Sequence, residues 1–250
     1  MMFREVEQVD IAPSIAVMLG LAFTCDGKPI KEVVRYARDC RRVYLVIVDS
    51  LGFEEYIVNR DKFPFLTTVE ERGYVFRCLS YSYLTTPSIA SILCGLRPGK
   101  HKVMRTEDAY ARRIKCLPEV AYDAGLRVAI VMEEYGAYSF HGLVSLVKPI
   151  PDTPDVLEFD ETSCRSAIDV LRELDPNLLV IHLRSLDVLG FTPAAMLHVD
   201  RSLRVLAESL INETIFFVVG DHPPHDRVYE RHVALIVFKV QPKTTKSSSS

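Results

Sequence analysis

Four short segments of the chain place side chains capable of metal binding or nucleophilic attack where a strand or helix should begin or end. Three are apolar runs that lead into an aspartate, and the fourth is a Thr-Thr-Pro-Ser turn that opens a helix. The residues concerned are Asp49, Asp187, the pair Asp221 and His222, and Thr85. In an open α/β sheet the loops at the carboxyl ends of the strands converge on one crevice. Carboxylates and an imidazole around a threonine at a helix N-terminus suit a metal-assisted nucleophilic site that acts on an anion.

The order and spacing of these segments carry a family resemblance. VYLVIVDSLG (residues 43–52) is a hydrophobic strand closed by Asp49, TTPSIASILCGLRPGKH (residues 85–101) is a Thr-x-Pro-Ser turn followed by a helix of small residues, and GDH (residues 220–222) is a late Asp-His pair. Together they resemble the alkaline phosphatase superfamily, most closely its nucleotide pyrophosphatase/phosphodiesterase (type I phosphodiesterase) branch. The resemblance covers nearly the whole chain and implies an alkaline phosphatase-like α/β fold.

The resemblance implies roles for four residues. Thr85 matches the nucleophile that becomes a phosphothreonine, and one metal ion would be bound by Asp49, Thr85, Asp221 and His222. Thr86 is the competing nucleophile, but in the family's Thr-x-Pro pattern the first threonine carries the chemistry. Read without the family, Thr85 is an ordinary helix cap, and the aspartates cap the helices that follow their strands.

The second metal site of the family departs from its pattern here. Asp187 is present, but the family's histidine four residues later is Phe191, which cannot bind a metal. Either His225 or His232 could be the final histidine, and His232 is preferred because it directly precedes an apolar strand. His182 is expected to point elsewhere or to lie in the core. The chain could therefore hold two ions, hold one ion, or have lost catalysis. Zinc suits mixed histidine and aspartate ligation, and manganese is also reasonable.

One family-like segment stands at an unusual place in the chain. EVEQVDIAPSIAVMLGL (residues 5–21) resembles the helix that normally follows the last strand of the catalytic domain. Its position predicts a circular permutation, which folds tolerate because chain termini commonly lie close together. The alternative is an ordinary amphipathic helix capped by Asp10. If the permutation is correct, the apolar residues of the segment should be buried. They are Ile11, Ile15, Val17, Met18, Leu19 and Leu21.

Composition predicts a globular chain without a nucleic-acid-binding or membrane-spanning character. The 250 residues are 48% hydrophobic and 25% charged, with a formal net charge of −3, which offers no basic surface for duplex nucleic acid. The apolar runs are too short to span a membrane, and charges near the N-terminus argue against a signal peptide. We therefore expect a cytoplasmic protein. None of the six cysteines forms a Cys-x-x-Cys pair, which argues against a zinc-thiolate site.

Hydrophobic periodicity predicts a doubly wound, mostly parallel sheet with helices on both faces. Strands are expected at residues 43–48, 74–80, 127–132, 178–183, 214–219 and 233–240. Helices are expected at residues 64–72, 87–94, 117–125, 163–174 and 193–210. The less regular region 133–161 could form a lid. Residues 1–240 are expected to form one catalytic domain, and residues 241–250 a disordered tail.

These observations predict a metal-dependent hydrolase of phosphate esters, with phosphodiester or nucleotide-like small-molecule substrates favoured. In this hypothesis the metal lowers the pKa of Thr85, the threonine displaces the leaving group, and a water held near Asp187 and His232 hydrolyses the phosphothreonine. One alternative is a catalytically inactive relative that binds phosphate or nucleotides. Others are a phosphomutase or phosphatase of the same superfamily, and a plain α/β interaction domain.

Overall fold

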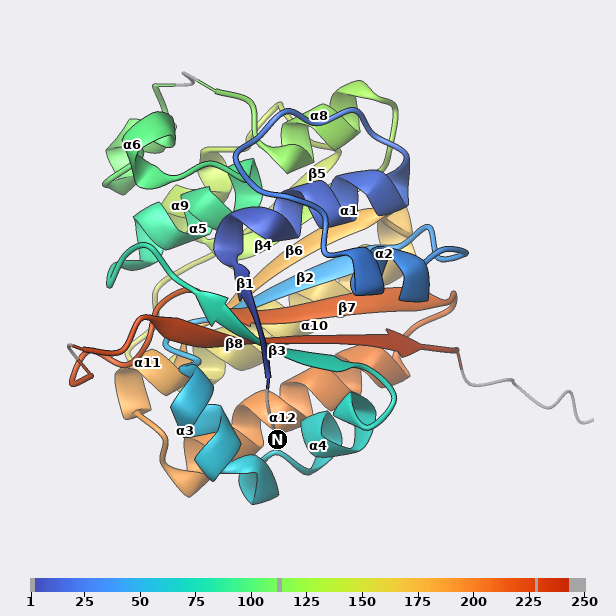
Figure 1. Ribbon diagram of the computed structural model, residues 1–250. Helices are drawn as coiled ribbons and strands as arrows, with labels where there is room; N and C mark the ends of the chain where they lie inside the picture. The colour runs from blue at the N-terminus through green and yellow to red at the C-terminus, as the bar shows by residue number, and fades with distance from the viewer. Residues whose placement is uncertain (1–2, 112–113, 228, 243–250) are drawn as a thin grey trace, which may run out of the picture.

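A computed structural model describes residues 3–111, 114–227 and 229–242, so the predicted disordered tail lies almost wholly outside the described residues. An eight-stranded sheet forms the centre of the molecule, with the strand order β1-β3-β8-β7-β2-β6-β4-β5 (Figure 1). The strands are β1 (Arg4–Glu7), β2 (Val43–Val48), β3 (Tyr74–Leu79), β4 (Val128–Glu133), β5 (Leu146–Ile150), β6 (Leu178–Leu183), β7 (Thr214–Gly220) and β8 (His232–Val240). Strand β8 runs antiparallel to both of its neighbours, and all other pairs are parallel. The predicted doubly wound, mostly parallel sheet is confirmed.

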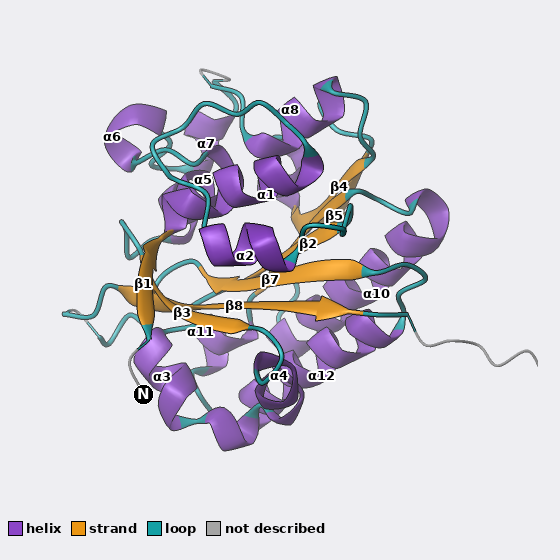
Figure 2. Ribbon diagram, turned by 45° about the vertical axis from the view of Figure 1, so that its right-hand side comes forward, coloured by secondary structure: helices purple, strands orange, loops and turns teal. Residues whose placement is uncertain are grey.

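Helices cover both faces of the sheet (Figures 1 and 2). One face carries α1 (Ile11–Leu19), α2 (Lys31–Tyr36), α5 (Thr85–Cys94), α6 (Pro98–His101), α7 (Thr106–Ala109), α8 (Leu117–Asp123) and α9 (Glu134–Tyr138). The other carries α3 (Phe53–Val58), η2 (Arg60–Lys62), α4 (Pro64–Glu70), α10 (Val156–Leu174), α11 (Ser185–Leu189) and α12 (Pro193–Glu208). A short 3₁₀ turn, η1 (Gln8–Asp10), joins β1 to α1.

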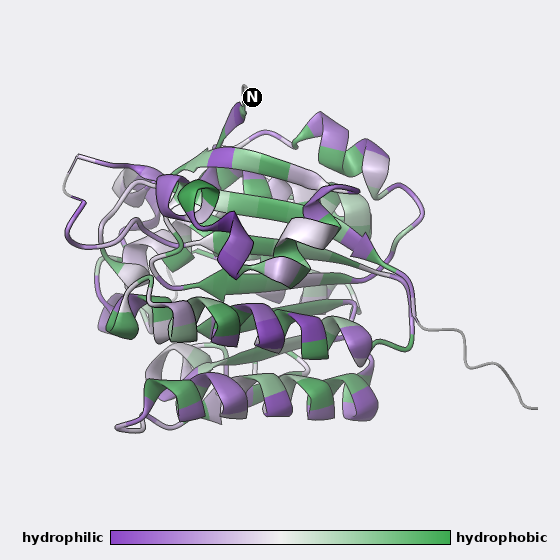
Figure 3. Ribbon diagram, turned by 90° about the horizontal axis from the view of Figure 1, so that it is seen from below, coloured by the Kyte–Doolittle hydropathy of each residue, from purple (hydrophilic) through white to green (hydrophobic). Residues whose placement is uncertain are grey.

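The central strands are apolar on both sides because both sides are covered. Every residue of β2, β6 and β7 is buried. This explains why these strands read in the sequence as continuous apolar runs rather than alternating ones. Two hydrophobic clusters, one on each face of the sheet, form the core. The long helices turn a hydrophobic stripe toward the sheet and a hydrophilic one toward solvent (Figure 3).

The predicted strands agree closely with the structure, and two strands were missed. Strands β2 and β6 have the predicted bounds. Strands β3, β7 and β8 differ from the prediction by one residue at one end, and β4 is shifted by one residue at both ends. The prediction of a lid at residues 133–161 is wrong, because this region supplies α9, the edge strand β5 and the first turn of α10. Strand β5 contains Pro149 and only five residues, so it lacks the long apolar run that marks the central strands.

The N-terminal segment is part of the sheet as well as of the helical layer. Strand β1 pairs in parallel with β3, and α1 packs against α5, α2 and α8. Ile11, Ile15 and Met18 are buried as expected, but Val17 is 46% exposed. The small residues Ala12 and Ala16 occupy the buried face instead, because they follow the helical spacing and Val17 does not.

Two further features bear on the predictions. Cys94 and Cys116 form a disulfide, a pairing that the sequence alone does not reveal. Cys25, Cys40, Cys78 and Cys164 are free thiols. No helix in the described part of the chain is both long enough and apolar enough to cross a membrane.

Candidate active site

Asp49 and Asp221 are brought together by the pairing of their strands. In the register of β2 and β7, Val48 lies opposite Gly220, so the next residue of each strand emerges side by side at the carboxyl edge of the sheet. This edge lies at the left of Figure 1, where β8 begins. Gly220 is required for the close approach, because a Cβ there would lie 2.3 Å from the carbonyl oxygen of Leu51. Both carboxylates are buried.

His222 completes a compact cluster with these carboxylates and with the predicted nucleophile. His222 Nε2 lies 3.1 Å from Asp49 Oδ1 and 3.6 Å from Asp221 Oδ2. The Oγ1 atom of Thr85, in the first turn of α5, lies 3.4 Å from the same nitrogen. Thr86 Oγ1 instead contacts Thr106 Oγ1 at 3.2 Å. The structure therefore places Thr85 rather than Thr86 against the cluster.

The atoms of this cluster fit a divalent metal ion. Asp49 Oδ1 and Asp221 Oδ2 are buried and have no hydrogen-bond partner among the described residues. An ion held tetrahedrally at about 2.0–2.2 Å has ligand atoms about 3.3–3.6 Å apart, close to the observed separations. His222 Nδ1 lies 2.9 Å from the carbonyl oxygen of Pro223 and donates to it, so Nε2 would be the nitrogen that binds the ion once it has lost its proton.

The buried charges around this cluster shift one another's pKa values. Burial and the neighbouring Asp49 carboxylate raise the pKa of Asp221 to about 7. Burial also pushes the pKa of Asp49 upward, but the adjacent His222 and His182 outweigh it and hold this pKa below its ordinary value. The two carboxylates raise the pKa of His222 to about 9 against the effect of burial. Two buried carboxylates thus attract positive charge to this point.

A second cluster lies beside the first and shares His222 with it. Asp187, in α11, lies 3.3 Å from His225, measured from Oδ1 to Nε2, and the rings of His222 and His225 are 4.7 Å apart. Ser50 joins the two clusters, because its hydroxyl donates to Asp187 Oδ1 at 2.6 Å and its backbone N–H donates to Asp221 Oδ1 at 3.0 Å.

His232 does not join either cluster. It begins β8, and its Nε2 lies 3.4 Å from Glu5 Oε2 of the N-terminal strand. The sequence favours His232 over His225 as the final histidine of the second metal site because His232 directly precedes the last apolar strand. The antiparallel direction of β8 aligns His232 with Leu79 of β3. His225 instead lies on the loop between β7 and β8, which passes over Asp187.

Phe191 and His182 both bear on the second metal site: Phe191 packs against the core, and His182 is buried, which is one of the two positions expected for it. Phe191 is half-buried, and its side chain packs against the hydrophobic cluster on the α10 and α12 face of the sheet. His182 is buried directly beneath the first cluster, where its Nε2 lies 3.7 Å from Asp49 Oδ2. Its Nδ1 lies 2.8 Å from Glu133 Oε2 at the end of β4. Strand alternation alone could not place His182, because every position of this strand is buried.

Several residues that support the site carry no recognisable sequence signal. Gln8 is fully buried and donates from Nε2 to the carbonyl oxygens of Asp221, at 2.6 Å, and Gly220, at 3.2 Å. Ser80 donates to the same Asp221 oxygen at 2.8 Å. Ser50 adopts a left-handed conformation, with φ of 62°. These contacts join residues that are far apart in sequence.

No known family model matches the sequence, and no curated protein matches it. Solved structures do match. Phosphonoacetate hydrolase from Sinorhizobium meliloti 1021, in complex with phosphonoacetate, is 18% identical with a TM-score of 0.59, over 73% of this chain and 56% of that one. Murine ectonucleotide pyrophosphatase/phosphodiesterase 5 is also 18% identical, with a TM-score of 0.56, over 73% and 57%. The chain thus spans just over half the length of each.

A third match is the C-terminal periplasmic domain of EptC from Escherichia coli, in complex with Zn. It is 13% identical with a TM-score of 0.58, over 81% of this chain and 73% of that domain. At sequence identities this low, the structural similarity establishes the fold and leaves the activity open. The chain has the fold of the alkaline phosphatase superfamily, as its motifs predict.

Proposed function

We propose that this protein is a metal-dependent hydrolase of phosphate esters, in which Thr85 is the nucleophile. The observation that carries the proposal is the convergence of Thr85 Oγ1, Asp49 Oδ1 and Asp221 Oδ2 on His222 Nε2, with separations of 3.1 to 3.6 Å. Asp49, Asp221, His222 and Thr85 would hold one divalent ion, either zinc or manganese. Such an ion supplies positive charge that lowers the pKa of the threonine hydroxyl.

Thr85 is placed to attack a phosphoryl group at the start of α5. In the first turn of α5 the backbone N–H groups of Thr85 and Thr86 have no helical partner and can bind phosphoryl oxygens, whereas Pro87 has no N–H group. Thr85 Oγ1 forms a bond to phosphorus as the ester P–O bond breaks, and the alcohol leaves. Water then cleaves the phosphothreonine, releasing phosphate or a monoester and restoring the hydroxyl. The preference for phosphodiester or nucleotide-like substrates rests on the sequence resemblance.

We assign the second cluster to Asp187 and His225 in place of His232. Because Phe191 stands where the family has a histidine, this second site lacks one histidine ligand. An ion at the second site should therefore bind more weakly than an ion held by Asp49, Asp221 and His222. The same loss favours, as a second candidate, an inactive relative that binds phosphate without hydrolysing it. Protein purified without chelator is expected to contain at least one zinc or manganese ion per chain. A chain without metal that also fails to bind zinc would exclude both candidates.

Turnover of p-nitrophenyl phosphate and bis-p-nitrophenyl phosphate tests the assignment of the nucleophile. Thr85→Ala should lower turnover by roughly 10³-fold or more, because the Thr85 hydroxyl is the one that faces His222 Nε2, whereas the Ser50 hydroxyl donates to Asp187. Binding of the first ion should weaken only modestly, since Asp49, Asp221 and His222 remain. Thr86→Ala is the matched control and should retain most of the activity. The reverse result for the two variants would show that the neighbouring threonine is the nucleophile.

A further inference from the structure

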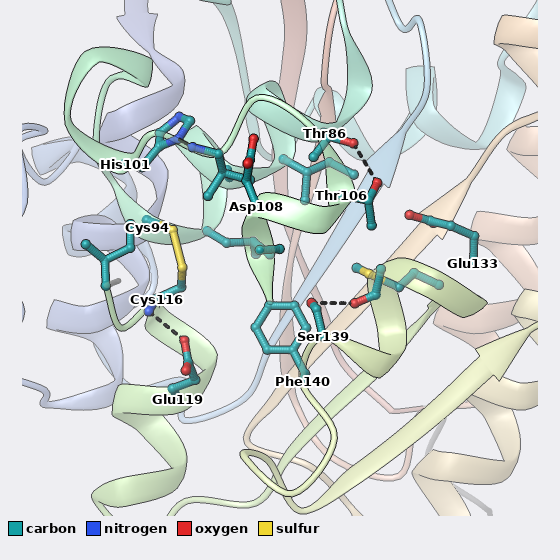
Figure 4. Close-up of a pocket in the computed structure, with 18 residues that line it drawn as sticks. Thr86, Cys94, His101, Thr106, Asp108, Cys116, Glu119, Glu133, Ser139 and Phe140 are labelled. Carbon is teal, nitrogen blue, oxygen red and sulfur yellow. Dashed lines mark hydrogen bonds between the residues drawn. A yellow bond between two sulfur atoms is a disulfide. The ribbon is translucent and has the colours of Figure 1, made fainter. Parts of the chain in front are cut away.

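A pocket runs along α5, from the N-terminal end of this helix, where Thr85 lies, to the Cys94–Cys116 disulfide. It has a volume of about 80 Å³, taken as space open to the centre of a water molecule. One helical stripe forms its longest wall, made of Thr86, Ile89, Ala90, Leu93 and Cys94. The stripe runs from Thr86 to Cys94, eight residue steps or about 12 Å along the helix axis. Figure 4 shows Thr86, Thr106 and Glu133 at one end of the pocket and the Cys94–Cys116 disulfide at the other.

The pocket lies next to the candidate active site. Thr86, at the end of the pocket away from the disulfide, is the residue after the proposed nucleophile. Glu133, on the opposite wall, binds His182 Nδ1 at 2.8 Å, and His182 Nε2 lies 3.7 Å from Asp49 Oδ2. We take one ester substituent of a phosphoryl group at Thr85 to enter the pocket from this end, its mouth, because Thr86 adjoins Thr85 in the first turn of α5.

The lining of the pocket favours an uncharged apolar group. Most of its surface is apolar, and Ile89, Leu93, Met132 and Phe140 are among the apolar residues that line it. Its three carboxylates are already engaged. Glu133 binds His182, Asp108 accepts from the N–H groups of Met104 and Arg105, and Glu119 accepts from the N–H group of Cys116.

The histidine of the pocket is neutral and held in place. Burial lowers the pKa of His101 to about 4, and the ring is fixed between the N–H group of Val103 and the hydroxyl of Ser91. Among the described residues that line the pocket, the three carboxylates and this imidazole are therefore all engaged by neighbouring groups.

The volume of the pocket limits the size of the apolar group that it can hold. A water needs roughly 10–15 Å³ of such space, so the pocket has room for roughly five to eight waters, or for one ring with few substituents. The space does not suffice for a complete nucleotide. We propose that this pocket binds the ester substituent of the substrate and selects phosphate esters that carry a single aromatic ring or a short branched alkyl group. This inference rests on the proposed function, because it takes the phosphoryl group to lie at Thr85.

The test compares ligands that differ only in the apolar group. Phenylphosphonate, methylphosphonate and phenol are titrated by calorimetry into the zinc-loaded full-length protein, and turnover of phenyl phosphate is measured in parallel. Wild-type protein should bind phenylphosphonate roughly 10- to 100-fold more tightly than methylphosphonate, as expected for burying one ring. Ala90→Leu, which places a larger side chain in the middle of the pocket wall, should reduce this ratio toward one. Ala124→Leu, at an exposed position outside the pocket, is the matched control and should keep the ratio.

A second variant covers the case in which Ala90→Leu fails to fold. Thr106→Leu fills the mouth of the pocket from a half-buried position and should also reduce the ratio. Equal affinity of wild-type protein for the two phosphonates, together with hydrolysis of phenyl phosphate, would overturn the pocket assignment and leave the proposed function standing. Binding of phenol that Ala90→Leu abolishes, without binding of either phosphonate or any turnover, would support the pocket and overturn the proposed function. An unchanged ratio in both filling variants would also overturn the pocket assignment.

Discussion

Ser50 links the two candidate metal clusters through its hydroxyl and its backbone. The hydroxyl donates to Asp187, and the backbone N–H group donates to Asp221, from a residue with φ of 62°. This backbone region costs an ordinary residue roughly 1 kcal/mol and glycine almost nothing. The site thus keeps a side chain where the backbone conformation would favour glycine.

Two substitutions separate these contributions of Ser50. Ser50→Ala and Ser50→Gly both remove the hydroxyl, so both should weaken binding at the Asp187 cluster by roughly 10-fold or more. Ser50→Gly also relieves the backbone, so its free energy of unfolding should exceed that of Ser50→Ala by about 1 kcal/mol. Zinc calorimetry and urea unfolding measure the two effects. Wild-type zinc affinity in both variants would show that the hydroxyl does not position Asp187.

Phe191 allows a direct test of the lost histidine ligand. Its ring packs against the core, so Phe191→His should place a polar ring in an apolar environment and lower the free energy of unfolding by about 1–3 kcal/mol. Zinc stoichiometry should not rise. Phe191→Leu, which keeps the position apolar, is the control and should be the more stable of the two. Additional or tighter zinc binding by Phe191→His would show that this position still faces the second site.

Candidate site residues could be recognised from the sequence where a single strand end or a single motif marks their position. Asp49, Thr85, Asp221 and His222 follow from strand ends and a helix start, which are local features. Gln8, Ser50 and Glu133 could not be found in this way, because their roles depend on contacts between strands that only the sheet order brings together. The same limit explains the choice of His232 over His225, which required the path of the loop between β7 and β8.

At the scale of elements, the end of α10 joins three strands at the edge of the sheet opposite the candidate site. Asp175 caps this helix in a left-handed conformation, with φ of 45°. Its carboxylate accepts from Arg42, directly before β2, and from Arg127, directly before β4. It also accepts from Asn212, in the loop before β7. The central apolar strands were predictable from periodicity, whereas this polar connection between them was not.

The hydrogen bond from Arg42 and the adjacent positive charges hold the pKa of Asp175 below its ordinary value. A lowered pKa means that the charged carboxylate stabilises the fold at neutral pH, and that this contribution is lost as the pH falls through the lowered pKa. Asp175→Asn keeps a residue that tolerates the left-handed conformation and removes the charge. Its free energy of unfolding should be about 1–3 kcal/mol below wild type at pH 7. The difference should shrink below about pH 4, the range in which the unfolded aspartate becomes protonated. A difference independent of pH from 7 to 3 would contradict this account.

At the scale of the whole molecule, circular permutation remains our explanation for the position of the N-terminal segment. Strand β1 pairs with β3, and the register places Arg4 beside Phe76 and Phe76 beside Leu235 of β8. Strand β8 continues five residues further, to Val240. Arg4 and Val240 are therefore two strand spacings apart across the sheet and five residues apart along it, a distance of roughly 20 Å. A linker of about ten residues can join two ends that lie this far apart.

Moving the segment back to the C-terminus tests this explanation. In the rearranged chain, residues 28–242 come first and are joined by a ten-residue linker to residues 3–27. It should fold with a melting temperature within several degrees of wild type, because every described contact is retained except the peptide bond between residues 27 and 28. Deletion of residues 1–22 is the comparison and should give unfolded or insoluble protein, since Ile11 and Ile15 are buried. A deletion variant with an unchanged melting temperature would contradict the account.

The hydrogen bonds of Gln8 to the carbonyl oxygens of Gly220 and Asp221 also have a consequence for synthesis. These partners are separated by more than two hundred residues, so Gln8 leaves the ribosome long before Gly220 and Asp221 do. In a chain that carried the same segment after its last strand, both sides would emerge together. Here the segment that carries Gln8 is synthesised well before the loop after β7. A nascent chain interrupted before residue 220 therefore carries most of the strands but lacks Asp221 and His222, so the proposed ion site could form only after this loop has been made.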